Sequence, residues 1–145
     1  MDAEQVDLER AAKIAALNDK FRSSGNVHVT KSLLDNISGF YEFVSIGITV
    51  RKFDSFNIDN DAYGEHDLGT FDWNGKKIMW KIDYYDQALT GWCDPLDPKC
   101  RRVLTIMLAS DYYARQCLGA VTAASKLYFT PYNASLANRA YRLRA

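Results

Sequence analysis

The residue types that could carry out chemistry gather between residues 57 and 86. One of the chain's two histidines lies there between two acids, and a strand-like stretch that follows holds a lysine and an aspartate. Imidazole, carboxylate and ammonium groups move protons in general acid–base catalysis, and carboxylate oxygens bind hard divalent cations. A metal-dependent hydrolase or nuclease needs such groups. The candidate catalytic residues are His66, Glu65, Asp67, Lys81 and Asp83.

The spacing in this segment differs from that of known metal sites. Asp59-x-Asp61 begins like a calcium-binding loop, but the fifth position is Tyr63 and the twelfth is Thr70 rather than Glu. No His-Glu-x-x-His motif, phosphate-binding Walker loop or serine elbow is present. We therefore expect no cofactor and no resident metal. If a divalent ion does bind, its expected ligands are Asp61, Glu65, His66 and Asp67.

The same segment also has the composition of a binding surface. Residues 54–75 carry six acids and neither Lys nor Arg, and aromatic residues lie among and after them. Tyrosine and tryptophan anchor many protein interfaces, and an acidic surface attracts a basic partner. We expect a protein partner with a basic surface, and no contact of this acidic face with nucleic acid or a membrane. The candidate binding residues are Asp59, Asp61, Tyr63, Glu65, Asp67, Tyr84, Tyr85, Asp86 and Trp92.

A structural role is the alternative for each of these residues taken alone. Loop acids cap turns and helices, Asp and Asn bond their own backbone, and His66 can serve as a hydrogen-bonded strut. A purely structural connector does not need six acids without a Lys or Arg. For the segment as a whole, this composition favours a binding role over a structural one. The formal net charge of zero gives no general argument for nucleic-acid binding. The function we expect is that of a small cytosolic interaction protein, with catalysis as the alternative.

A hairpin is the element that would position the second half of the segment. Asn74-Gly75 is the pair that a type I′ turn requires, because both central residues take positive φ. Counting by twos then puts an apolar set on one face, which we expect to be core. The opposite face is expected to be polar, or covered by something that tolerates charge. The apolar set is Phe71, Ile78, Trp80, Ile82 and Tyr84.

The rest of the chain predicts an α+β fold. A helix is expected over residues 6–22, ending at Gly25 in a left-handed conformation, and a short strand over 27–30 is followed by a brief helix over 31–37. The alternation of Val44, Ile46, Ile48 and Val50 with smaller or polar residues predicts a strand over 43–53. That strand and the hairpin would form an antiparallel meander.

A long helix is expected after the turn cluster DPLDP. Asp97 is a candidate N-cap and Pro98 occupies the favoured first position. The helix is expected to run from 98 to 117 and to pack across the sheet. The predicted fold class is thus α+β, with an N-terminal helix, an antiparallel sheet of three to four strands with an Asn-Gly hairpin, and a long helix packed on the sheet.

One domain is expected over residues 1–117, with a basic extension over 118–145 packed on it. Residues 100–145 carry seven Lys or Arg and one acid. The chain starts without an apolar leader, and its three cysteines lack Cys-x-x-Cys spacing, so we expect a reducing cytoplasm and free thiols. Cys93 and Cys100 flank a proline-containing loop and could bridge if oxidised.

Several long segments carry a family resemblance: ALND at 16–19, NDAYGEHDLG at 60–69, WKIDYYD at 80–86, DPLDP at 94–98 and RVLTIMLA at 102–109. With these the chain resembles an uncharacterised bacterial family, the domain of unknown function 3768, over residues 12–113. Ala62 stands where that family usually has Pro, and Trp92-Cys93 replaces a pair of small residues. The resemblance implies a proteobacterial protein carried on plasmids and other mobile elements, and therefore suggests counter-defence. It implies no established activity.

Overall fold

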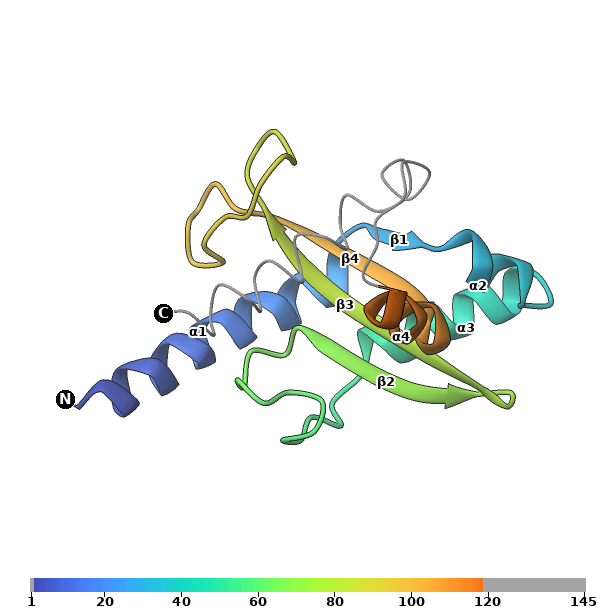
Figure 1. Cartoon of the computed structure of the whole chain (residues 1–145), viewed down its shortest axis with the longest axis horizontal. Coiled ribbons are helices and arrows are strands. Elements are labelled where there is room, and N and C mark those ends of the chain that lie inside the picture. The colour runs from blue at the N-terminus through green and yellow to red at the C-terminus, as the bar shows by residue number, and fades with distance from the viewer. Residues whose placement is uncertain (1, 119–145) are drawn as a thin grey trace.

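A computed structural model of the chain describes residues 2–118 (Figure 1). Four helices and four strands lie within these residues and form a mixed α+β arrangement. The predicted fold class is confirmed in its N-terminal helix and its mostly antiparallel four-stranded sheet. In chain order the elements are α1 (Ala3–Ser24), β1 (Val27–Val29), α2 (Lys31–Asp35), α3 (Phe40–Arg51), β2 (Leu68–Trp73), β3 (Lys76–Tyr85), β4 (Arg101–Leu108) and α4 (Ala109–Leu118).

The strands of the sheet lie in the order β1-β4-β3-β2. β2, β3 and β4 form an antiparallel meander, and β1 pairs with β4 in parallel, with Val27 opposite Leu104. Asn74 and Gly75 join β2 to β3, with φ values of 46° and 77°. The two inner strands, β3 and β4, are therefore paired on both edges.

Helices cover both faces of this sheet. On one face, α1, α2 and α3 contribute Ile14, Leu33 and Ile46 to a core that also contains Trp80 and Tyr84 of β3. On the other face, α4 closes a smaller apolar cluster, and Figure 1 shows it opposite α1 and α3. The predicted apolar face of the hairpin is confirmed, because Ile78, Trp80, Ile82 and Tyr84 are all buried in the larger core.

The strand predicted over residues 43–53 is wrong, because this segment is helix α3. The alternation arose because α3 is apolar on its outer side as well as its inner side. Ile46 and Val50 face the core at helical spacing, whereas Val44 and Ile48 are exposed. The exposed apolar pair filled the gaps in the helical pattern and produced a false period of two.

The helix predicted over residues 98–117 is also wrong in its first half. Residues 101–108 form β4, and only the part from Ala109 onward is helical. β4 runs between β1 and β3 with Leu104, Thr105, Ile106 and Met107 all buried. A strand buried on both faces has a continuous apolar sequence without alternation, which resembles a helix core. The predicted meander therefore exists, but its third strand is β4.

The N-terminal predictions are closer. The helix predicted over residues 6–22 is confirmed as α1, the short strand as β1 and the brief helix as α2. The predicted left-handed cap is wrong, because Gly25 has φ −76° and ψ 167°. Glycine is required there by space, since a Cβ would lie 2.6 Å from the carbonyl oxygen and ring of Phe21. The extension predicted over 118–145 lies outside the described residues from residue 119 onward.

Within residues 2–118, none of the helices combines the length and the apolar composition needed to cross a membrane.

Candidate functional site

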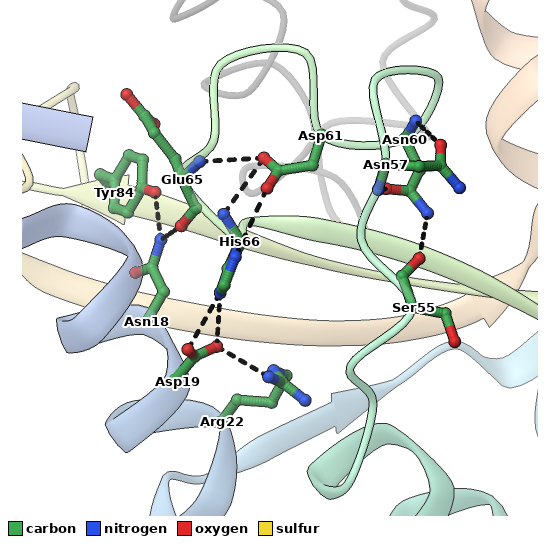
Figure 2. Close-up of polar contacts among 10 residues, drawn as sticks. All are labelled: Asn18, Asp19, Arg22, Ser55, Asn57, Asn60, Asp61, Glu65, His66 and Tyr84. Carbon is green, nitrogen blue, oxygen red and sulfur yellow. Dashed lines mark hydrogen bonds and ion pairs between the residues drawn. The ribbon is translucent and has the colours of Figure 1, made fainter. Parts of the chain in front are cut away.

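His66 lies between two carboxylates at the end of the loop that leads into β2. Its Nδ1 is 2.9 Å from Oδ2 of Asp19 on α1, and its Nε2 is 3.7 Å from Oδ2 of Asp61 (Figure 2). The imidazole stacks on the ring of Phe56, with 3.8 Å between centroids and an interplanar angle of 2°. Both ring nitrogens therefore face protein carboxylates, and one ring face is covered.

Asp61 fixes the backbone of this loop. Its Oδ1 accepts hydrogen bonds from the backbone N–H groups of Glu65 and His66, at 2.9 and 3.2 Å. Gly64 and His66 both have positive φ, and the Asp61 carboxylate stabilises the tight bend that these conformations create. The Asp61 side chain is 5% exposed. It is thus part of the loop's internal frame and contributes little to its outer surface.

A second set of polar bonds fixes the beginning of the loop. The Asn57 side-chain oxygen accepts the N–H groups of Asp59 and Asn60. The Asn60 side chain in turn accepts the Asn57 N–H and donates to the Ser55 carbonyl at 2.9 Å (Figure 2). These are the local side-chain-to-backbone bonds that asparagine forms in turns. Residues 54–67, which we call the acidic loop, therefore have a defined conformation at both ends.

Asn18 connects the acidic loop to the core. Its side chain is fully buried, and its Nδ2 donates to the Glu65 carbonyl at 2.9 Å and to the Tyr84 hydroxyl at 2.7 Å (Figure 2). Arg102 on β4 donates to the Asn18 Oδ1 at 2.8 Å, and its guanidinium lies over the Tyr84 ring. One amide thus joins α1, the acidic loop, β3 and β4.

Arg22 extends the same network along α1. Its guanidinium donates to Asp19 Oδ1 at 2.8 Å and to the Val50 carbonyl at 2.7 Å, and it lies 4.8 Å from the Trp80 ring. Asp19 therefore accepts from a buried arginine and also contacts His66. The Arg22 charge and the Asp19 charge are compensated within the protein.

The predicted catalytic set is not brought together. Lys81 and Asp83 form a 2.8 Å ion pair, with side chains 2% and 1% exposed. They alternate along β3 with Trp80, Ile82 and Tyr84, so they lie on the opposite face of the sheet from the His66 network. The face of the hairpin opposite the apolar set was expected to be polar, or covered by something that tolerates charge. This face is covered, and it holds the buried Lys81–Asp83 ion pair.

The aromatic residues predicted for binding divide into buried and exposed groups. Tyr84 and Tyr85 are buried, so as surface anchors they are wrong; Tyr84 belongs to the core, and burial together with Asp83 raises the pKa of Tyr85. Tyr63 and Trp92 are exposed, and their role in binding stays a prediction. A tyrosine pair at the end of a strand has the same sequence signature whether it faces the core or the solvent.

The acids predicted for binding divide in the same way. Asp59 is exposed, whereas Glu65 is buried and Asp67 is partly buried. Asp86 accepts the backbone N–H and the hydroxyl of Thr90, and the backbone bond is the main reason that its pKa is lowered. Asp86 is thus a turn cap. Asp61 and Glu65 are therefore covered by the fold, whereas Asp86 is partly exposed, and the binding role of these acids stays a prediction.

The expected metal ligands do not form a coordination cluster. His66 faces Asp61, but the Asp61 Oδ1 is already bound by backbone donors, and Figure 2 shows the Glu65 side chain extending away from the imidazole. Among the side chains that the structure describes, no group of three or more His, Cys, Asp or Glu is placed to hold a metal ion.

Several residues of this network were missed by sequence reasoning, namely Asn18, Asp19, Arg22, Phe56 and Arg102. All of them except Phe56 come from other segments, and His66 and Asp19 are 47 positions apart, so no local spacing relates them. One signal was available, because Asn18 and Asp19 lie in the ALND segment that carries the family resemblance.

Cys93 and Cys100 are both free thiols. Burial raises the pKa of the Cys100 thiol to about 11 and also raises that of Cys93. Both groups are therefore weak nucleophiles at neutral pH.

A family model described as "Protein of unknown function (DUF3768)" matches residues 14–111. This match covers the second half of α1, the whole sheet and the acidic loop. No curated protein and no solved structure matches the chain.

Proposed function

The chain belongs to the family described as protein of unknown function DUF3768, and from the acidic loop we propose that it is an interaction protein that binds a basic partner protein. One observation carries this proposal: the loop's hydrogen bonds fix its backbone while the side chains of Ile58 and Tyr63 are left exposed. Ile58 is 75% exposed and Tyr63 is 50% exposed. Asp54 and Asp59 are exposed beside them.

A rigid loop with exposed anchors is suited to association. Binding costs less when the interface is already ordered, and here Asn57, Asn60 and Asp61 order it in the free protein. The Tyr63 ring is an anchor type that contributes much of the energy of protein interfaces. The exposed carboxylates would steer a basic partner toward the loop and set the salt dependence of the encounter.

The chemistry of the loop also supports a class of partner. Basic protein surfaces are common on proteins that handle nucleic acid, because they neutralise phosphates with Lys and Arg. Inhibition of such a host protein in the cytoplasm, as counter-defence by a mobile genetic element, fits an acidic loop of this kind. The plasmid context implied by the family resemblance supports the same role.

A metal-dependent hydrolase or nuclease is the second candidate, and one observation favours it. The Asp19–His66 contact at 2.9 Å is the arrangement in which a carboxylate orients a catalytic imidazole. However, the second nitrogen faces Asp61 at 3.7 Å, and Lys81 and Asp83 lie across the sheet. Because the imidazole bridges two carboxylates, its geometry favours a strut between α1 and the loop.

Pull-down from a bacterial lysate with the full chain as bait tests the proposal. The expected partner is a basic, nucleic-acid-handling protein, and its affinity should fall with rising salt, since charges beyond about 8–10 Å are screened near physiological ionic strength. Asp54→Asn with Asp59→Asn should slow association with the recovered partner. Ile58→Ser with Tyr63→Ser should speed dissociation by about tenfold or more.

A matched control removes two exposed acids elsewhere, with Asp7→Asn and Glu9→Gln on α1, and should leave both rates unchanged. All three variants are expected to keep the wild-type melting temperature, because the altered side chains are exposed. The proposal fails if the partner binds the loop variants and the control variant alike. Binding that is independent of salt would remove the acidic loop from the mechanism.

A further inference from the structure

Helix α3 presents an apolar surface on the side that faces away from the core. Phe40 is 73% exposed and Tyr41 is 88% exposed, and their rings contact each other edge to face, with 6.3 Å between centroids. Val44 and Ile48 continue the exposed stripe one and two turns later. A contiguous exposed apolar patch of this kind often marks an interaction site. The outer side of α3 is therefore a candidate interface.

A groove lies beside this stripe, on the same helix. It has a volume of about 290 Å³ and is bounded by β1, α2 and α3, with Ile106 of β4 at its base. An apolar cavity of about 150 Å³ is enough to take up a benzene ring. The groove can therefore accept an aromatic side chain. Its α3 wall includes Phe43 and Gly47.

Gly47 keeps this groove open. It is in the middle of α3, where glycine is less favourable than alanine, and a Cβ placed on it would meet no atom within 4 Å. The space beside Gly47 is therefore not occupied by another part of the described chain. A larger side chain at this position would project into the groove and fill it.

We propose that the occupant is a second copy of this chain, in a two-fold symmetric dimer formed by antiparallel α3 helices. Tyr41 and Gly47 are equally distant from Val44, so an axis through Val44 places each Tyr41 ring beside Gly47 of the partner subunit. Six residues of helix span about 9 Å, which sets the separation of the two equivalent contacts. In a two-fold interface the same surface must supply both the projecting ring and the groove. The exposed side of α3 supplies both.

The exposed area is consistent with a stable interface. A Phe or Tyr side chain offers about 150–250 Å², so Phe40 and Tyr41 together present roughly 250–400 Å² on each copy. A standard interface takes about 800 Å² from each partner. Phe43, Val44 and Ile48, with Leu34 of α2, provide further exposed apolar surface. No residue of the acidic loop lines the groove, so the dimer leaves the proposed partner-binding loop accessible.

Sedimentation equilibrium of the full chain tests the dimer. The wild type should show a monomer–dimer equilibrium. Phe40→Ser with Tyr41→Ser, which removes the projecting rings, and Gly47→Leu, which fills the groove, should each raise the dimer dissociation constant at least tenfold. Val6→Ser with Leu8→Ser removes comparable exposed apolar side chains from α1 and should have no effect. Circular dichroism confirms that each variant is folded.

The position of the axis is tested by cross-linking. Val44→Cys should give a disulfide that joins the two substituted positions after mild oxidation, identified by mass spectrometry, and Leu8→Cys should not. A wild type that remains monomeric up to about 1 mM, the weak end of specific association, overturns the proposal. Three other results would also overturn it: a dimer that persists in both α3 variants, open-ended polymers, and a monomer whose groove binds an unrelated amphipathic helix.

Discussion

The buried amide of Asn18 shows how much one side chain can specify. It satisfies the Glu65 carbonyl, the Tyr84 hydroxyl and the Arg102 guanidinium at once, from a position on α1 with no exposed surface. Its removal leaves buried donors and acceptors without their partner, which costs more than the loss of an exposed hydrogen bond. The conformation of the acidic loop thus depends on a residue far from it in the sequence.

Asn18→Leu should therefore lower the free energy of unfolding by about 1–3 kcal/mol, the penalty for leaving buried polar groups unsatisfied. Urea denaturation measures this change. Asn26→Leu, at an exposed position just after α1, is the matched control and should change stability by less than about 0.5 kcal/mol. Equal effects of the two substitutions would show that the Asn18 network does not stabilise the fold.

At the scale of elements, Glu42 connects α3 to the β2–β3 hairpin. Its carboxylate accepts the Ser38 backbone N–H, the Trp73 indole N–H and the Asn74 amide. These bonds, with the Ser38 backbone bond the largest, lower the pKa of Glu42 to about 2. The side chain therefore links the segment just before α3 to the turn of the hairpin.

Because the folded-state pKa is below the ordinary value of 4.5, the ionised carboxylate stabilises the fold fully above about pH 4.5. This contribution is lost as the pH falls through about 2. Glu42→Gln should be less stable than the wild type at neutral pH, and the difference should shrink between pH 4.5 and pH 2. Thermal melts across this range test it, with Glu9→Gln as the exposed control. A difference that stays constant with pH would contradict the assignment.

The hairpin turn supplies a second prediction at this scale. Gly75 has φ 77°, and a Cβ there would meet no atom within 4 Å, so a side chain would be penalised only by backbone strain. Gly75→Val should lower the free energy of unfolding by about 1–3 kcal/mol. Lys77→Val, two residues later and exposed, should change it little. Equal melting temperatures for wild type and Gly75→Val would show that the positive φ at Gly75 does not penalise a side chain.

The elements that sequence reasoning identified correctly are those in which one side is apolar and the other is polar. α1 and the apolar face of β3 belong to this group. α3 and β4 were misassigned for a common reason, because both are apolar on two sides: α3 at its exposed stripe and β4 between two layers. Periodicity carries no information when neither side is polar. The acidic loop was located correctly, but its partners on α1 and β4 depended on the fold.

At the scale of the whole molecule, the sheet combines local and distant pairings. β2, β3 and β4 follow one another along the chain, whereas β1 pairs with β4 across the register Val27–Leu104. Closing such a long loop is entropically costly, so pairings of this kind tend to form late in folding.

Val29→Ala in β1 should therefore speed unfolding and leave the refolding rate nearly unchanged. Ile78→Val, in the β2–β3 hairpin, should slow refolding. Stopped-flow tryptophan fluorescence, to which the buried Trp80 contributes, measures both rates. The prediction is wrong if the slower refolding of Val29→Ala accounts for all of the stability that the variant loses. In that case β1 is already paired with β4 in the transition state.

The central place of β4 also affects how the chain folds on the ribosome. Among the strands of residues 2–118, β4 is the last to be synthesised, yet it lies between β1 and β3 and contributes Leu104 and Ile106 to the main core. Until residue 108 has left the exit tunnel, Ile14, Leu33 and Ile46 have only part of a sheet to cover them. A nascent chain in this state exposes three apolar helix faces and the unpaired edge of β3, the kind of surface that chaperones bind. Synthesis to the end of β4 is therefore the step after which this chain can first bury its core.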